Sequence, residues 1–184
     1  MEASWGIVVF SVIVGALLGG VVHAVVDRYS AFRESQGIAI ALGSEIDAIL
    51  TLMRERDYKS ILDKYIIPLH TSSYKATDQD LISIYIKQDY FIVYNSICPK
   101  IGLLGELSGQ ITRFYYLTKS LIEDINDYRE MNDNVMKGMS VVLREPLLNR
   151  YLETREFLTK IESEGPQLLK RLKHYSEQYF LSCT

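Results

Sequence analysis

The longest uninterrupted run of hydrophobic positions lies close to the N-terminus. From Gly6 to Val26 the chain has 21 consecutive residues without Asp, Glu, Lys or Arg. At about 1.5 Å of helical rise per residue this run is about 31 Å long, the thickness of the hydrocarbon core of a bilayer. The pattern predicts a single membrane-spanning helix, which with the N-terminal tail forms a first region, 1–28.

Two other interpretations of the run are weaker. A secretory signal peptide begins with basic residues and has a shorter apolar centre. Here the tail carries Glu2 and no base, although Val22-His23-Ala24 could pass as a cleavage site. A buried core helix seldom needs so many consecutive residues without charge. We therefore favour a membrane anchor.

Beyond the anchor, hydrophobic positions recur every three or four residues, which is typical of amphipathic helices. The first stripe comprises Phe32, Ser35, Ala39, Leu42, Ile46, Ile49 and Met53. No proline interrupts residues 27–65, so the span is expected to continue as one rod, with Gly37 or Gly43 as soft points. Asp57 is expected to cap a short helix over Tyr58–Ile67 that Pro68 ends.

The second half of the chain alternates breaks with further helical stripes. Residues 70–79 are polar and turn-rich, and Leu81–Ile86 could be a strand or a helix. A short helix over Asp89–Ser96 is expected to end at the break Cys98–Gly102. The next stripe comprises Leu107, Ile111, Phe114, Thr118, Leu121, Ile125 and Tyr128, widened by Tyr115, Leu117 and Ile122.

Two more helices are expected towards the C-terminus. One starts at about Asn134 and continues to Ser163, with Pro146 kinking it or opening a new helix. Gly165-Pro166 predicts a stop followed at once by a new start, because glycine ends helices and proline begins them. The fold class is thus all-α: an N-terminal transmembrane helix followed by a cytoplasmic antiparallel bundle of four longer helices over 29–184.

The charges beside the span predict its orientation. The N-terminal tail has no basic residue, whereas Arg28 and Arg33 follow the span directly. Lys and Arg near a span are retained on the cytoplasmic side. We expect the N-terminus outside the cell and the body in the cytoplasm.

Small residues mark one side of the span. Ser11, Gly15 and Gly19 recur every four residues, and such spacing allows two helix backbones to approach closely in a membrane. We expect a homo-oligomer formed through the span, although an unpaired span is nearly as consistent with the pattern. His23 is the only ionisable residue within the span, and it lies near enough to the membrane surface to reach water.

Composition and charge narrow the classes of partner. The net charge of −3 and the pI near 5.7 provide no basic field, so nucleic acid is not expected as a partner. In a cytoplasmic domain, Cys98 and Cys183 are expected to be reduced thiols, and neither fits a metal-ligand spacing.

No pattern of catalytic residues is present. The sequence contains no Ser/His/Asp, Cys/His or HExxH arrangement, and Gly102-Leu-Leu-Gly105 lacks the Lys-Ser/Thr ending of a phosphate loop. The acidic residues Glu123, Asp124 and Asp127 fit a solvated helix face better than a cation site. We expect no cofactor, no metal and no enzymatic activity.

Three basic residues, Lys170, Arg171 and Lys173, lie together on the last helix. They could contact anionic lipid if that helix ends near the membrane, where each basic residue contributes about 1 kcal/mol. An ordinary charged surface, balanced by Glu162, Glu164 and Glu177, is the simpler interpretation.

One stretch resembles uncharacterised bacterial membrane-anchored helical proteins. The matching residues are Phe91-Ile-Val-Tyr94, Lys100-Ile-Gly-Leu-Leu104, Ile111, Phe114-Tyr115 and Lys119-Ser-Leu-Ile-Glu-Asp124. The arrangement, a span followed by a helical domain, is also similar. The resemblance implies a bacterial inner-membrane setting and no catalytic residue.

Two functional hypotheses follow. The first is a membrane-tethered helical module without catalytic activity, which binds a protein partner or itself. The second is an oligomeric, membrane-acting effector or channel, of the stress-response or phage-exclusion type. One span with so few polar residues would need many copies to line a pore, so ion conductance in vesicles separates the two hypotheses.

Overall fold

Within residues 3–70, 90–136 and 144–178, which the computed structural model describes, the chain is helical and contains no strand. The elements are α1 (Ala3–Glu55), α2 (Tyr58–Leu69), α3 (Ile92–Ile97), the 3₁₀ helix η2 (Cys98–Leu104), α4 (Leu107–Met136) and α5 (Arg144–Ser176). The expected all-α class is therefore confirmed. Leu81–Ile86 lies outside the described residues.

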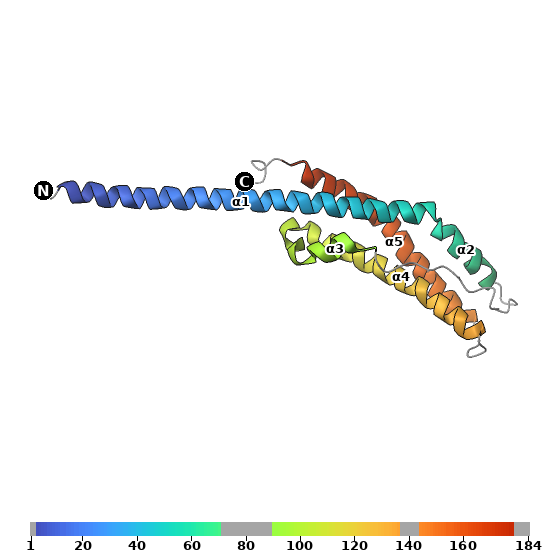
Figure 1. Ribbon diagram of the computed structural model, residues 1–184. Coiled ribbons are helices and arrows are strands. Elements are labelled where there is room, and N and C mark those ends of the chain that lie inside the picture. The colour runs from blue at the N-terminus through green and yellow to red at the C-terminus, as the bar shows by residue number, and fades with distance from the viewer. Residues whose placement is uncertain (1–2, 71–89, 137–143, 179–184) are drawn as a thin grey trace.

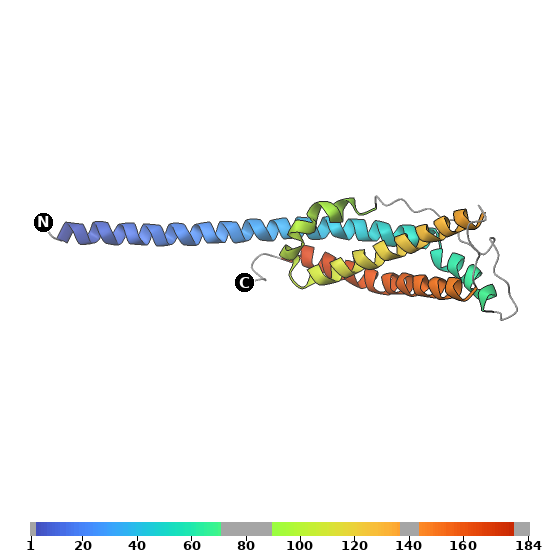
Figure 2. The ribbon, with the colours of Figure 1, turned by 90° about the horizontal axis from the view of Figure 1, so that it is seen from below.

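The first helix, α1, joins two very different environments. Its N-terminal part extends away from all other elements as a straight rod (Figures 1 and 2). Of the described helices, α1 is the one long and apolar enough to cross a membrane: its apolar part has a mean hydropathy of 2.4, and none of that part is buried. This exposure excludes the interpretation as a core helix. The helix passes Gly37 and Gly43 without a break.

The buried side of α1 begins at Ser35, directly after Glu34, which pairs with Lys100 of η2. From there α5 runs antiparallel to α1 and to α4, and the two views show α4 and α5 side by side (Figures 1 and 2). The expected stripe on α1 is buried from Ser35 to Met53, and Phe32 is half-buried. The stripe expected on α4 is buried at every position. Both predictions of the core are confirmed.

The short helix α2 turns away from α1 at Asp57. Asp57 has φ 46° and ψ 47°, a left-handed conformation that aspartate tolerates better than most residues, and its side chain accepts a hydrogen bond from Ser60 N at 3.4 Å. The predicted cap is thus confirmed. The helix ends at Leu69 rather than Ile67, because Pro68 is accommodated in the last turn.

Two predicted boundaries are wrong and two are confirmed. The helix α4 continues to Met136, so no new helix starts at Asn134. A new helix, α5, instead begins at Arg144, with Pro146 in its first turn as one of the two expected alternatives. The helix α3 ends at Ile97, at the expected break, and Cys98–Leu104 form the 3₁₀ helix η2. Gly165-Pro166 does not divide the last segment, because α5 is continuous through it. The bundle consequently has three long rods and the short α2 instead of four longer helices.

The continuity of α5 has a packing cause. Its core positions keep the alternating spacing of three and four residues across the Gly-Pro pair, and they comprise Leu147, Tyr151, Thr154, Leu158, Ile161, Gly165, Leu168 and Leu172. A proline inside a helix costs about 3 kcal/mol. Pro166 is exposed, and burial of the apolar side chains on both sides of it outweighs that local cost.

Candidate functional site

The end of the bundle next to the exposed part of α1, here called the span-side end, brings together the last turn of α5, η2 and α1. Gln36 Nε2 on α1 donates to Ser176 O at 3.0 Å and to Gln178 O at 2.7 Å. Tyr175 Oη donates to Ser35 Oγ at 3.0 Å or to Leu103 O at 3.2 Å. These bonds hold the C-terminal end of α5 beside the first buried turn of α1.

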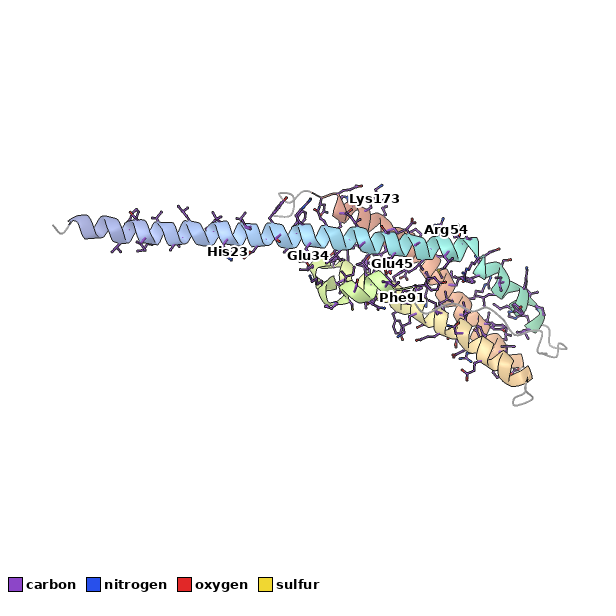
Figure 3. All side chains as sticks on the ribbon, viewed as in Figure 1. His23, Glu34, Glu45, Arg54, Phe91 and Lys173 are labelled. Atoms are coloured by element: carbon purple, nitrogen blue, oxygen red, sulfur yellow. The ribbon has the colours of Figure 1, made fainter. Side chains whose placement is uncertain are left out.

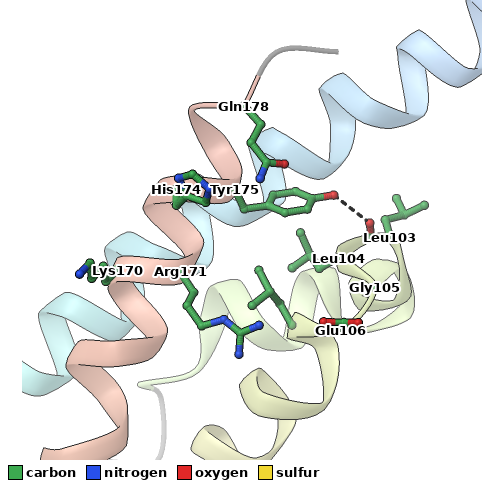
Figure 4. Close-up of a pocket in the computed structure, with 10 residues that line it drawn as sticks. Leu103, Leu104, Gly105, Glu106, Lys170, Arg171, His174, Tyr175 and Gln178 are labelled. Carbon is green, nitrogen blue, oxygen red and sulfur yellow. Dashed lines mark hydrogen bonds between the residues drawn. The ribbon is translucent and has the colours of Figure 1, made fainter. Parts of the chain in front are cut away.

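A pocket of about 520 Å³ opens at the span-side end between α5 and the η2–α4 connection (Figure 4). Its apolar lining comes from Leu103, Leu104 and Leu107, and Gly105 forms the turn into α4 with φ +54°, a conformation that favours glycine. The polar lining residues are Glu106, Lys170, Arg171, His174, Tyr175 and Gln178. Among the residues that line it, no nucleophile pairs with a base. The pocket therefore combines an apolar floor with a charged rim.

The three basic residues predicted to contact lipid lie on the outside of this end of the bundle. Lys170 and Arg171 border the pocket, and Lys170 and Lys173 border a second groove between α5 and α1. All three side chains are exposed. Ser176 contacts Gln36, and Gln36 is ten residues after Val26, the end of the apolar run. Lys173 lies one helical turn before Ser176 on α5, and therefore one turn further from the span.

That placement determines how near these residues come to lipid. If the apolar core of a membrane ended at Val26, an upright α1 would hold Gln36 about 15 Å from it and Lys173 about 20 Å from it. The headgroup layer is only about 6 Å thick. Lipid contact through Lys170, Arg171 and Lys173 therefore requires a strongly tilted α1, and it stays a prediction.

The small-residue side of the span faces open space. A Cβ atom added at Gly15 or Gly19 would have nothing within 4 Å. Ser11 lies on the same exposed part of α1. One turn from the end of the span, His23 Nε2 lies 3.3 Å from Asp27 Oδ2, with both side chains exposed. No segment of the described chain covers Gly15 or Gly19, which leaves that side available to a second helix.

A cluster around Glu45, which was not among the predicted site residues, joins α3 and α4 to α1. The Glu45 carboxylate accepts hydrogen bonds from Val93 N at 2.8 Å, Tyr94 N at 3.0 Å and Tyr115 Oη at 2.6 Å. Figure 3 shows Glu45 on the side of α1 that faces Phe91. Burial and the hydrogen bond to Glu45 raise the pKa of the Tyr115 hydroxyl. No local pattern marks this cluster, because its three donors lie 48 to 70 residues from Glu45 in the sequence.

A second polar cluster joins α4 to α5 at the other end of the bundle. Tyr128 and Thr154, both fully buried, share a hydrogen bond, and the Thr154 hydroxyl also lies 3.4 Å from Asp124 Oδ2. Arg150 Nη2 pairs with Asp127 Oδ2 at 2.6 Å. Burial raises the pKa of the Asp124 carboxyl, and the nearby Arg150 offsets only part of this effect.

The raised pKa of Asp124 predicts a pH-dependent stability. The folded state holds the proton of Asp124 more tightly than the unfolded state, so the stability from this group is present below its ordinary pKa of about 3.9 and is lost as pH rises through the raised value. Asp124→Asn keeps the oxygen that faces Thr154 and removes the half-buried charge. We expect it to raise the Tm of the detergent-solubilised chain at pH 7 and to leave the Tm unchanged at pH 3.

Glu123→Gln is the matched control for Asp124→Asn. Glu123 is exposed and lies 3.8 Å from Lys119, a weak surface pair. It should leave the Tm nearly unchanged at both pH values. A lower Tm for Asp124→Asn at pH 7 would contradict the burial argument.

The acidic residues on α4 do not form a cation site. Glu123 faces Lys119, Asp127 pairs with Arg150 and Asp124 meets Thr154. In the described part of the chain, no group of three or more His, Cys, Asp or Glu side chains is arranged to hold a metal. No family model, curated protein or solved structure matches this chain.

Proposed function

We propose that this chain is a membrane-tethered helical protein without catalytic activity, which assembles with itself and presents its bundle to a protein partner at the membrane surface. The supporting observation is the uninterrupted α1, which joins an apolar part that nothing covers to a part buried in the bundle. A soluble protein would expose that apolar surface to water at a large cost in free energy. A bilayer removes this cost.

The orientation follows from the same helix. Arg28 and Arg33 are exposed on α1 between the apolar part and the bundle, on the bundle side of the span. Basic residues next to a span stay in the cytoplasm. We therefore place the bundle at the cytoplasmic face, with membrane lipid as its first partner.

Self-association is supported by small residues on one side of α1, in the span and again in the bundle. Gly19 and Gly37 are 18 residues apart, about five full turns, so they lie on the same side of the helix. In the bundle, Gly37, Ser44 and Ala48 are exposed on that side. Two copies could therefore approach closely at Ser11, Gly15 and Gly19 and again beside Gly37, whereas His23, Val26 and Arg33 lie on the same side between these two stretches.

Substitutions in the span test this proposal. Gly15→Ile and Gly19→Ile should each separate two packed spans and reduce association several-fold, because a branched side chain replaces the closest backbone contact. Val14→Ile is the control, since Val14 lies on another side of the helix and gains only one methylene. A reporter of span association in a bacterial membrane ranks the three variants directly.

Equal association signals from all three variants would exclude the small-residue side as the contact. Any oligomer would then have to form through the bundle. A monomeric signal from the unsubstituted span would exclude association through the span altogether.

A further inference from the structure

Among the described elements of the bundle, η2 lies nearest to the span. Lys100 Nζ on η2 lies 2.5 Å from Glu34 Oε1 on α1. Glu34 is eight residues after Val26, so η2 stands at a level about 12 Å beyond the end of the apolar run. Both ribbon views place η2 at the end of the bundle from which the free part of α1 extends (Figures 1 and 2).

The outer surface of η2 is suited to a lipid interface. Its seven residues contain no acid and one base, Lys100. Leu103 is 40% exposed, and Cys98, Pro99 and Gly102 are exposed beside it. Apolar side chains flanked by a basic residue are typical of segments that lie at the headgroup layer.

Contacts with α1 and α5 fix the position of η2. Leu104 is buried, with 2% of its surface exposed, and the carbonyl of Leu103 faces the Tyr175 hydroxyl at 3.2 Å. The Lys100–Glu34 pair ties the outer edge to α1. These contacts hold the exposed apolar surface of η2 in place, so that Leu103 stays at the surface of the bundle.

An ordinary tilt of α1 brings this surface to the lipid headgroups. Packed helices lie about 10 Å apart, so tilting α1 by about 30° towards η2 lowers η2 to about 5 Å from the hydrocarbon edge. This is the level of the headgroup layer, and the tilt is within the range found for spans. The basic residues of α5 start about 8 Å further away, which is why η2 reaches the membrane before they do.

We propose that η2 is a membrane-contacting foot: Leu103 enters the headgroup layer of an anionic leaflet, Lys100 lies among its phosphates, and the contact sets the tilt of the rod. The proposal rests on the membrane anchor put forward above and adds a second, separate contact of the same chain with the bilayer. Because this contact would fix the orientation of the bundle, the same side of the bundle would always face away from the membrane and be open to a partner.

Cys98 provides the reporter for the test, since it is an exposed thiol on η2 itself. The full-length chain with Cys183→Ser is labelled at Cys98 with a fluorophore and placed in nanodiscs of phosphatidylethanolamine and phosphatidylglycerol. A fraction of the lipids carries a quencher on the headgroup. We expect several-fold stronger quenching at Cys98 than at a label on Asn149→Cys in a chain that also carries Cys98→Ser, since Asn149 is exposed at the far end of α5.

A matched pair of variants identifies the cause of the quenching. Leu103→Glu, at a position that is already partly exposed, should reduce quenching at Cys98 to the level of the Asn149→Cys label. Ile67→Glu makes the same apolar-to-acid change on α2, where the side chain is 68% exposed at the far end of the bundle, and should leave quenching at Cys98 unchanged.

Each other result overturns the foot. Quenching at Cys98 no stronger than at the distal label would show that η2 stays away from lipid, and a blue-shifted but unquenched label would show that protein covers it. Full quenching in Leu103→Glu would show that the tilt has another cause. A chain that does not remain with the nanodisc would instead overturn the membrane anchor, and the foot with it.

Discussion

Glu45→Ala is expected to release α3 from the bundle and to lower the free energy of unfolding by about 3 kcal/mol, because buried polar groups lose a charged acceptor. Three hydrogen bonds end on the Glu45 carboxylate, two from backbone N–H groups of α3 and one from Tyr115. Tyr115 is only 2% exposed, so water cannot readily replace the lost acceptor. Urea unfolding of the full chain in detergent micelles, followed by near-UV circular dichroism, measures the loss.

Asp47→Ala is the matched control for Glu45→Ala. Asp47 is an exposed acid two residues further along α1, and its removal should change the free energy of unfolding by less than about 0.5 kcal/mol. Hydrogen exchange adds a local measurement, since the amides of Val93 and Tyr94 should lose protection in Glu45→Ala. Equal losses in the two variants would show that the carboxylate does not hold α3.

Gly165→Leu is expected to destabilise the bundle by about 3 kcal/mol through overpacking. Gly165 is buried where α5 passes α1 and α4, and an added Cβ would lie 2.8 Å from Leu50 Cδ1 and 3.0 Å from Phe114 Cε2. A leucine adds three more carbons at the same place. The two neighbouring helices would have to move apart, which the same urea titration detects.

Two comparisons separate steric overlap from other causes. Gly43→Leu replaces a glycine in α1 that has nothing within 4 Å, so it should be neutral or stabilising by up to about 1 kcal/mol, the gain in helix propensity. Leu50→Ala should partly rescue Gly165→Leu by making room, which a double-mutant cycle measures as a favourable coupling. Additive losses would contradict the overlap.

Much of the fold could be predicted from the spacing of hydrophobic residues. The stripes on α1 and α4 form the core of the bundle. A spacing of three and four residues places side chains on one side of a helix, and this holds whichever neighbouring helix that side packs against. The same rule was available for α5, whose stripe continues through Gly165 at the correct spacing. The break predicted at the Gly-Pro pair is absent because the energy of burial along the stripe exceeds the local cost of proline.

The candidate site could be predicted only in part. The basic residues of α5 were visible in the sequence, but their distance from the membrane depends on which turn of α1 meets the end of α5. That contact, Gln36 with Ser176, joins residues 140 positions apart. The roles of Glu45, Thr154 and η2 likewise depend on neighbours from other helices, and no local pattern encodes them.

The sequence by itself determined that the chain is helical, which residues form its core and where it carries a span-length apolar run. These properties depend on side-chain chemistry and on the period of the helix. The single rod of α1 was also predicted, since no proline interrupts residues 27–65. The tertiary structure decided that α5 is unbroken, that its end meets Gln36 on α1, and that η2 lies nearest to the span among the described elements of the bundle. These depend on long-range packing, where the summed burial of side chains from several helices outweighs the preference of any single residue.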